Sequence, residues 1–210
     1  MISPFDNLSS LQISRLYDLL GVHIYRYNKG DKVLSTIRKE NIICILLEGS
    51  AQIVFNEYNG NEIVMETLVK DSVFGTNISA TNIDNCDIFA KSNSEVLVID
   101  YKKLMNPKNL KHVYYNTFIY NLFEIVNSKS KERNERIRIL EKKQIRDKLL
   151  EYFEIEYKKA HSKNIYPTMS LKDLADYMAV NRSAMFREIK HLKDDKLIEI
   201  KDKRITLLYK

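Results

Sequence analysis

The sequence predicts an α+β protein in which an antiparallel β-domain is followed by a long helix and a small helical domain ending in a β-hairpin. All five glycines fall within the first 75 residues, among short apolar runs. Residues 108–166 contain neither glycine nor proline, as expected for long helices. The last third combines amphipathic segments with two β-branched runs. We therefore expect three segments, 1–106, 107–142 and 143–210.

Charge is distributed unevenly along a chain of otherwise ordinary globular composition. Of the formal net charge of +6, residues 143–210 carry +5, from 16 Lys and Arg against 11 Asp and Glu. A basic C-terminal third favours a polyanionic partner. The longest apolar run, residues 42–47, is too short to cross a bilayer, and the N-terminus does not resemble a signal peptide. We therefore expect a cytoplasmic protein with no membrane partner.

The first segment is expected to begin with a helix and continue as strands. A leucine stripe predicts a helix over residues 10–20. Apolar runs at residues 42–47, 53–55, 63–65 and 96–99 predict strands. Asn59 and Gly60 form an Asn-Gly pair between two of these runs, which predicts a hairpin turn.

The cysteines and histidines of the chain do not form a metal-binding, cofactor-binding or catalytic pattern. Cys44 lies in an apolar run and is expected to be a buried small hydrophobe, whereas Cys86 lies in a polar stretch and is open to a reactive role. The four histidines lack metal-ligand spacing. No phosphate-binding glycine loop or catalytic triad is evident. We therefore expect no metal, no cofactor and no enzyme activity.

A long helix is predicted from Pro107, with Asn106 as its N-cap, to about Leu140. It would be roughly 50 Å long, more than a small β-domain can cover. A twin helix in a homodimer is the simplest way to bury the rest. Two shorter helices broken in the polar stretch 127–136 are the alternative. The apolar face expected to serve the dimer comprises Tyr114, Phe118, Leu122 and Ile125.

Three further helices are predicted in the last segment. The first spans residues 144–160, with an apolar stripe along one side. The second opens at Ser170, where Ser170 and Asp173 have capping-box spacing, and buries Leu174, Ala175 and Met178. The third, residues 182–193, follows Asn181 as its N-cap. Two such helices joined by a tight connection have the order of a helix-turn-helix.

The third helix divides into an apolar face and a basic face. At about 100° per residue, Met185, Ile189 and Leu192 share one sector. The opposite side carries Ser183, Arg187 and Lys190, and one flank carries Arg182 and Phe186. A DNA recognition helix needs this division, because one side seats on the domain while the other enters the major groove. A solvated charged face on an ordinary helical hairpin is the alternative.

Two short strands, 197–200 and 205–208, are predicted to follow, with Lys201, Asp202, Lys203 and Arg204 as a basic turn between them. Two helices followed by a hairpin with a cationic tip have the winged-helix order. Such a tip would contact phosphates, which position a protein on DNA without reading sequence.

The chain resembles the Crp/Fnr family of bacterial regulators over nearly its whole length. The segment SLKDLADYMAVNRSAMFREIKHLKDDKLIEIKDKRITLL is similar to the family's winged helix-turn-helix, and LLEGSAQIVF, NGNEIVMETL and VFG are similar to parts of its sensor. The resemblance implies an N-terminal antiparallel β-roll (a double-stranded, jelly-roll-like β-helix), a dimerisation helix and a DNA-binding domain. It implies base-reading roles for Arg182, Ser183 and Arg187. The expected DNA-backbone contacts are Ser170, Asn181, Lys190, Lys201, Lys203 and Arg204.

The sensor departs from the cyclic-nucleotide-binding pattern. Thr76 follows Gly75, where those members place a glutamate, and Asp84 and Asn85 stand where an arginine would hold the phosphate. An aspartate there would repel a cyclic phosphate. The cysteines that ligate an iron–sulfur cluster in another branch are missing. We therefore expect neither cAMP binding nor such a cluster, and the effector is unknown.

Taken together, these features predict a homodimeric transcription regulator that binds a pseudo-palindromic site on double-stranded DNA, with RNA polymerase as a further partner if it activates. The alternative is a ligand-sensing module whose helical C-terminal domain docks a protein partner. Steeply salt-dependent binding to duplex DNA would discriminate between them.

Overall fold

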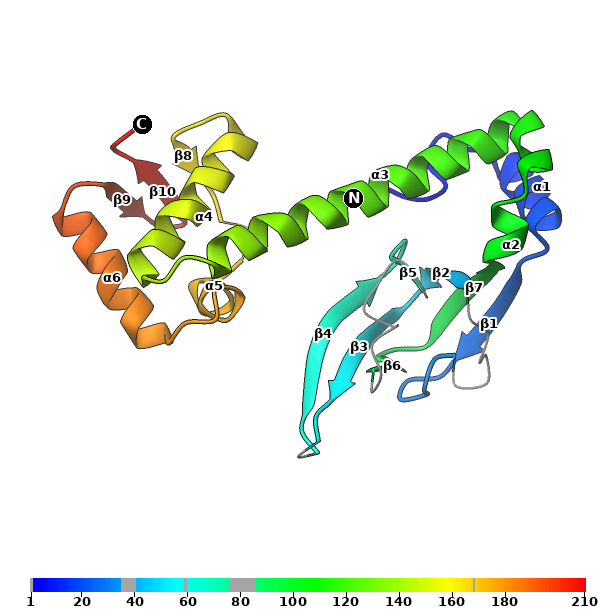
Figure 1. The fold of residues 1–210 in the computed structure, drawn as a ribbon, viewed down its shortest axis with the longest axis horizontal. Helices are drawn as coiled ribbons and strands as arrows, with labels where there is room; N and C mark the ends of the chain where they lie inside the picture. The colour runs from blue at the N-terminus through cyan, green and yellow to red at the C-terminus, as the bar shows by residue number, and fades with distance from the viewer. Residues whose placement is uncertain (1, 35–40, 59, 76–85, 168) are drawn as a thin grey trace. The chain divides into compact units, whose positions relative to one another are not determined.

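The computed structural model describes residues 2–34, 41–58, 60–75, 86–167 and 169–210. The chain forms two compact units, Met1–Ser128 and Lys129–Lys210 (Figure 1). Antiparallel sheets and helices occur in both units, which confirms the predicted α+β class. One helix, α3 (Val113–Leu140), contributes residues to both units.

Two antiparallel sheets form the β-roll of the first unit. One sheet has the order β1-β7-β2-β5 and the other has the order β4-β3-β6. The hairpin expected at Asn59 and Gly60 is present as the β3–β4 pair, although Asn59 itself lies outside the described residues. The strands are β1 (His23–Tyr27), β2 (Ile42–Glu48), β3 (Ser50–Asn56), β4 (Glu62–Val69), β5 (Val73–Gly75), β6 (Cys86–Ala90) and β7 (Ser94–Asp100).

The central strands of the first sheet, β2 and β7, are apolar on both sides and are buried on both faces of the sheet. Alternate residues of β2, such as Cys44 and Leu46, pack inside the roll against residues of the second sheet, including Ile53 and Ile88. The intervening residues, such as Ile43 and Ile45, pack on the other face against helices. This arrangement explains why residues 42–47 form a continuous apolar run rather than an alternating one.

Side-chain caps begin the first two helices of the first unit. Helix α1 (Ser10–Leu20) has the predicted bounds, with Ser9 and Gln12 forming a capping box and Gly21 ending the helix in a left-handed conformation. Helix α2 (Tyr101–Leu104) follows directly on β7 and is capped by Asp100.

The prediction that the long helix begins at Pro107 is wrong. Asn106 does cap a helix with Pro107 in its first turn, but that helix is a separate 3₁₀ segment, Pro107–Lys111. His112 then adopts an extended conformation (φ −101°, ψ 116°), which interrupts helical hydrogen bonding. The buried Asn109 side chain donates to the main-chain oxygen of Lys103, 2.8 Å away, and ties the short segment to α2. Helix α3 is then continuous for 28 residues, including the polar stretch 127–136.

The expected dimer face of the long helix also needs correction. Phe118, Leu122 and Ile125 are buried in the chain's own core together with residues of α1 and the first sheet, and Tyr114 packs against the same cluster. These residues therefore pack within their own chain and are not available to pack against a partner helix. The apolar residues that α3 leaves exposed lie on its other side, and include Val113, Tyr120, Phe123 and Ile137.

The second unit contains four helical stretches and a three-stranded sheet of order β8-β10-β9 around one core. The β8 strand is only two residues long and was not predicted. Thr206 Oγ1 donates to Asn164 Oδ1 across the β8–β10 pair, at 2.8 Å. Besides the end of α3, the elements are α4 (Ile145–Ala160), β8 (Asn164–Ile165), α5 (Leu171–Tyr177), α6 (Arg182–Asp194), β9 (Ile198–Lys201) and β10 (Arg204–Leu207).

Candidate nucleic-acid interface

Helices α5 and α6 are joined by a tight connection with a cap on each helix. The Ser170 hydroxyl accepts a hydrogen bond from the Asp173 main-chain nitrogen, and Asn181 Oδ1 accepts one from that of Ala184. Ala179, between the helices, has a positive φ of 52°. Because left-handed backbone is unfavourable for a residue with a Cβ, the connection must hold Ala179 in place. The local sequence gave no signal of this conformation.

The apolar face of α6 lies where its periodicity predicts. Met185, Ile189 and Leu192 are buried in the core of the second unit. That core includes Leu149 and Phe153 of α4 as well as residues of β9 and β10. Helix α6 is therefore held by apolar contacts along one side, which leaves its other side available to solvent.

The polar side of α6 carries exposed cations. Arg182, Ser183, Arg187 and Lys190 are all exposed. Within the described part of the chain, none of the three basic residues pairs with a carboxylate. The Arg182 guanidinium instead lies over the ring of Phe186, with Cζ 5.6 Å from the ring centre. The donors of Arg187 and Lys190 are therefore free to bind an external anion or base edge.

Two carboxylates, one within α6 and one at its C-terminal cap, pair with a cation of α4. Arg146 of α4 contacts both Glu188 Oε1, at 3.3 Å, and Asp195 Oδ2, at 2.6 Å. This bridge does not follow from local spacing, because the partners are 42 and 49 residues away in the chain. It fixes α4 to α6.

The β9–β10 hairpin presents the basic turn that the sequence predicts, although its strands are shifted. Lys201 and Arg204 pair with each other as strand residues, so the turn itself consists of Asp202 and Lys203. Asp202 takes the positive φ, at 56°. Lys201 and Lys203 are exposed, and Arg204 is half-buried. The hairpin tip therefore offers two exposed lysine side chains rather than a row of four charged residues.

The two expected backbone contacts at helix caps have partners already. The Ser170 hydroxyl donates to Asp173 Oδ2, at 2.7 Å, in addition to its capping bond. Asn181 uses its side-chain oxygen for capping. The Asn181 amide nitrogen keeps its donors for a phosphate, whereas the Ser170 proton is directed to a carboxylate.

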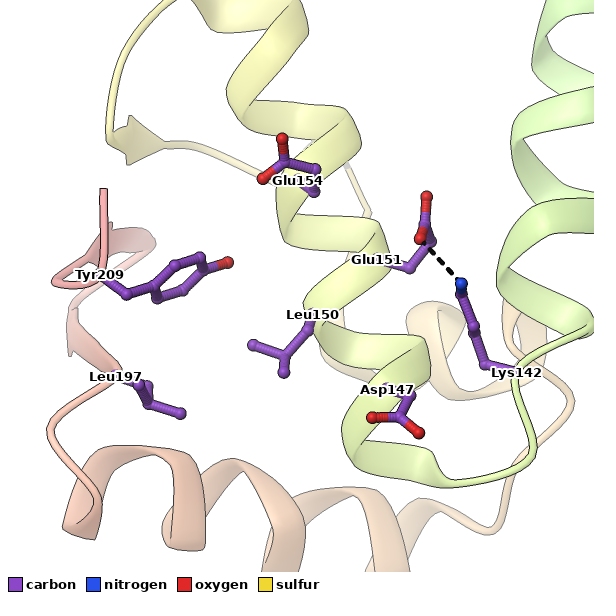
Figure 2. A pocket seen from close by; sticks show the side chains of 7 residues that line it. All are labelled: Lys142, Asp147, Leu150, Glu151, Glu154, Leu197 and Tyr209. Atoms are coloured by element: carbon purple, nitrogen blue, oxygen red, sulfur yellow. Dashed lines mark ion pairs between the residues drawn. The ribbon is translucent and has the colours of Figure 1, made fainter.

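A cavity of about 560 Å³ lies elsewhere on the second unit, beside α4 (Figure 2). Its lining includes Leu150, Leu197 and Tyr209, with Asp147, Glu151 and Glu154 along α4. Lys142 Nζ lies 3.3 Å from Glu151 Oε2. A hydrogen bond from Lys210 holds the pKa of Glu154 below its ordinary value. Cations here are paired with carboxylates, so this region is not suited to phosphate.

The end of α3 is fixed to the helix-turn-helix within the second unit. Arg136 Nε donates to the main-chain oxygen of Tyr177, at 3.2 Å, and its guanidinium lies 5.2 Å from the Tyr177 ring centre. Lys148 Nζ donates to the main-chain oxygen of Met178, at 2.9 Å. These contacts cap the C-terminal end of α5, where main-chain oxygens lack helical partners.

In the β-roll, one of the four predicted cassette positions, Gly75, lies within the described residues. Gly75 ends β5 with φ 133°, and a Cβ there would lie 2.3 Å from the main-chain oxygen of Ile42. Only glycine fits this close approach between strands. Thr76, Asp84 and Asn85 lie outside the described residues.

The two cysteines differ in environment. Cys44 is fully buried, as predicted, and burial raises its pKa to about 12. Cys86 is partly buried, and its pKa is raised by desolvation and by Asp87. In the described ranges, no three acidic, histidine or cysteine side chains gather in a way that could hold a metal ion. None of the helices in these ranges is long and apolar enough to cross a membrane.

Comparison with known proteins extends these observations. The cyclic nucleotide-binding domain model matches residues 25–106. The structure of a cysteine-to-serine variant of CprK complexed with OCPA is similar with a TM-score of 0.61 and 15% identity, over 94% of this chain and 89% of that chain. A CooA variant from Carboxydothermus hydrogenoformans gives a TM-score of 0.55 and 16% identity, over 98% and 88%. None of the curated proteins matches the chain in sequence. At these identities, the likeness to the solved structures establishes a shared fold.

Proposed function

Because this chain is a Crp/Fnr-like protein in domain content and fold, we propose that it is a homodimeric transcription regulator that binds double-stranded DNA. Residues 143–210 would be its DNA-binding domain, 107–142 its dimerisation helix and 1–106 its sensor. Arg182, Ser183 and Arg187 would read bases in the major groove. Lys190, Lys201, Lys203, Arg204 and the Asn181 amide would contact the DNA backbone.

The observation that carries this proposal is the division of α6 into two faces. One face is buried on the unit's core through Met185, Ile189 and Leu192, while Arg187 and Lys190 on the other face are exposed and unpaired in the described part of the chain. A guanidinium can donate two hydrogen bonds to guanine O6 and N7. When the guanidinium is exposed and unpaired, no ion pair within the protein has to break before it binds the base.

The exposed side of α3 supports a homodimer. Eight exposed residues follow one another at alternating spacings of three and four, which is the heptad spacing of a coiled coil. We call them the α3 row: Val113, Asn116, Tyr120, Phe123, Asn127, Ser130, Asn134 and Ile137. The aromatic side chains of Tyr120 and Phe123 are 63% and 61% exposed. A second copy of α3 suits this row, because asparagines within a coiled-coil seam pair with their own counterparts and fix the register.

We infer that the sensor does not respond to cAMP. The sequence places Asp84 and Asn85 where an arginine would be needed, and a carboxylate there opposes a phosphate. Thermal unfolding measured with and without millimolar cAMP is expected to give the same midpoint. A midpoint that rises with cAMP concentration would contradict this part of the proposal.

The proposal is tested by selecting duplexes from a random pool with the full-length protein and measuring their affinity against salt. We expect a two-fold symmetric consensus with half-sites about 34 Å apart, and a steep decrease of affinity with salt. Enrichment of no sequence, together with no binding of any duplex at low salt, would refute the proposal and favour a docking module for a protein partner.

A further inference from the structure

We propose that Phe186 is a specificity-determining residue that contacts the 5-methyl group of a thymine next to the base read by Arg182. This inference rests on the proposed DNA-binding function. It adds an apolar contact to an interface that otherwise consists of polar and charged groups.

Phe186 is unusual for its position on α6. Its side chain is 38% exposed, and it does not belong to the described core cluster that holds Met185, Ile189 and Leu192. The neighbouring exposed residues, Arg182 and Arg187 among them, are polar or charged. A large ring in this setting leaves apolar area in water, which is unfavourable unless a partner covers it. The ring therefore fits a contact that forms when a partner binds.

The contact between Arg182 and Phe186 places a cation and an apolar surface side by side. The guanidinium lies over the ring, with Cζ 5.6 Å from its centre. This contact engages no hydrogen-bond acceptor, so the N–H groups that point away from the ring remain available for hydrogen bonds to a base. The contact also limits the rotamers of Arg182 in the free protein, which reduces the side-chain entropy that is lost when DNA binds.

Such a pair matches two neighbouring features of the major groove. Guanine presents O6 and N7 to an arginine, and thymine presents its methyl group to an apolar side chain such as phenylalanine. Because Arg182 and Phe186 are adjacent on the same flank of α6, the two bases should be adjacent as well. The structure thus points to a half-site containing a thymine next to a guanine.

The test uses the consensus duplex selected by the full-length protein. Each thymine of one half-site is replaced in turn by deoxyuridine, which removes only the methyl group. Burial of one methyl group corresponds to about a fourfold change in Kd, so replacement at one position should weaken binding by about fourfold. That position should neighbour the base pair at which Arg182→Ala loses discrimination.

Variants of the protein separate a direct contact from an effect on DNA shape. Phe186→Ala should bind the thymine and deoxyuridine duplexes equally well, and Phe186→Gln provides a second variant should the first fail to fold. Tyr166→Ala removes another exposed aromatic side chain of the same unit, outside α6, and should retain the difference. Circular dichroism and salt dependence check that each variant is folded and binds DNA.

The outcomes distinguish this inference from the proposed function. Selective DNA binding with no thymine at which deoxyuridine weakens binding would overturn the role of Phe186 alone. A methyl effect that persists in Phe186→Ala and Phe186→Gln would overturn it too. Absence of any duplex binding by the wild-type protein would instead refute the proposed function on which the inference rests.

Discussion

Arg146 Nη2 lies 2.6 Å from Asp195 Oδ2, so the first turn of α4 is bonded to the residue that ends α6. The same guanidinium also contacts Glu188 within α6. One guanidinium of α4 thereby pairs with two carboxylates, one within α6 and one at its C-terminal cap. Arg187, on the other side, keeps its full charge and its donors, and the predictions about DNA depend on this separation.

Replacement of Arg187 by alanine should weaken binding and relax specificity at one base pair of each half-site. A bidentate arginine–guanine contact contributes about 1–3 kcal/mol of discrimination, so preference at that position should fall by about tenfold or more. Binding-site selection with the variant measures this. Arg15→Ala, which removes an exposed arginine of α1, should give the wild-type consensus. Unchanged discrimination in Arg187→Ala would exclude base reading by this residue.

Lys203 at the hairpin tip should contribute affinity without selectivity. Lys203→Ala is expected to weaken binding to all sequences by a similar factor, because phosphates are the same everywhere. The slope of log affinity against log salt should become less steep by about one for each subunit that loses its phosphate contact. Titrations of specific and unrelated duplexes at several salt concentrations test this. Unequal losses among sequences would show that Lys203 reads bases.

Ala179→Gly should stabilise the second unit. Ala179 has φ 52°, where a Cβ costs about 1–2 kcal/mol and glycine has no such penalty. The greater flexibility of glycine in the unfolded chain offsets part of this gain, which leaves about 0.5–1 kcal/mol. Urea unfolding measures the change. Ala184→Gly, inside α6, should destabilise by about 1 kcal/mol. A lower stability of Ala179→Gly would mean that the turn is not strained at this residue.

Phe123→Glu should dissociate the homodimer. Phe123 is in the α3 row, and a carboxylate buried in place of this ring without a partner costs several kcal/mol, so the dimer Kd should rise by more than about tenfold. Sedimentation equilibrium gives the mass at each concentration. Ser128→Glu adds the same charge to α3 outside the row and should leave the mass unchanged. A Phe123→Glu protein that remains dimeric at the same concentrations would rule out this face as the seam.

Cys44 should resist thiol reagents in the native protein. Burial raises its pKa from the ordinary 9.0 to about 12, so the neutral thiol is favoured in the folded state. The folded state therefore gains stability from this group below pH 9 and loses it as the pH rises towards 12. In a Cys86→Ser protein at pH 8, labelling of Cys44 should occur only in denaturant. Rapid labelling without denaturant would show that the inside of the roll opens readily.

Local chemistry accounts for the features that could be predicted from the sequence. Ser9 caps the start of α1, Gly21 ends it, and Asn181 caps the start of α6. Each of these residues makes its capping bonds to groups that lie only a few positions away in the sequence. The face of α6 that is buried follows from its periodicity. These features can therefore be predicted from the local sequence, without information about distant parts of the chain.

Features that depend on distant residues were mispredicted or missed. An apolar stripe such as Phe118, Leu122 and Ile125 shows that a face is buried but not by what, and the β-roll core covers it rather than a partner. The two-residue strand β8 is too short to show alternation. The 3₁₀ segment at Pro107 is tied to α2 by the bond from the buried Asn109 to Lys103, a contact that the capping pattern does not reveal.

Within the part of the chain that the structure describes, cations around the cavity beside α4 are paired with carboxylates and the exposed arginines of α6 are not, and this difference affects how the protein would approach a DNA duplex. Around the cavity beside α4, lysines are matched by Glu151 and Glu154, whereas the exposed arginines of α6 are not matched. In the field of a polyanion, such a unit experiences a torque that turns α6 towards the phosphates before any contact forms. Productive encounters would therefore outnumber those expected from random collisions, and more so at low ionic strength.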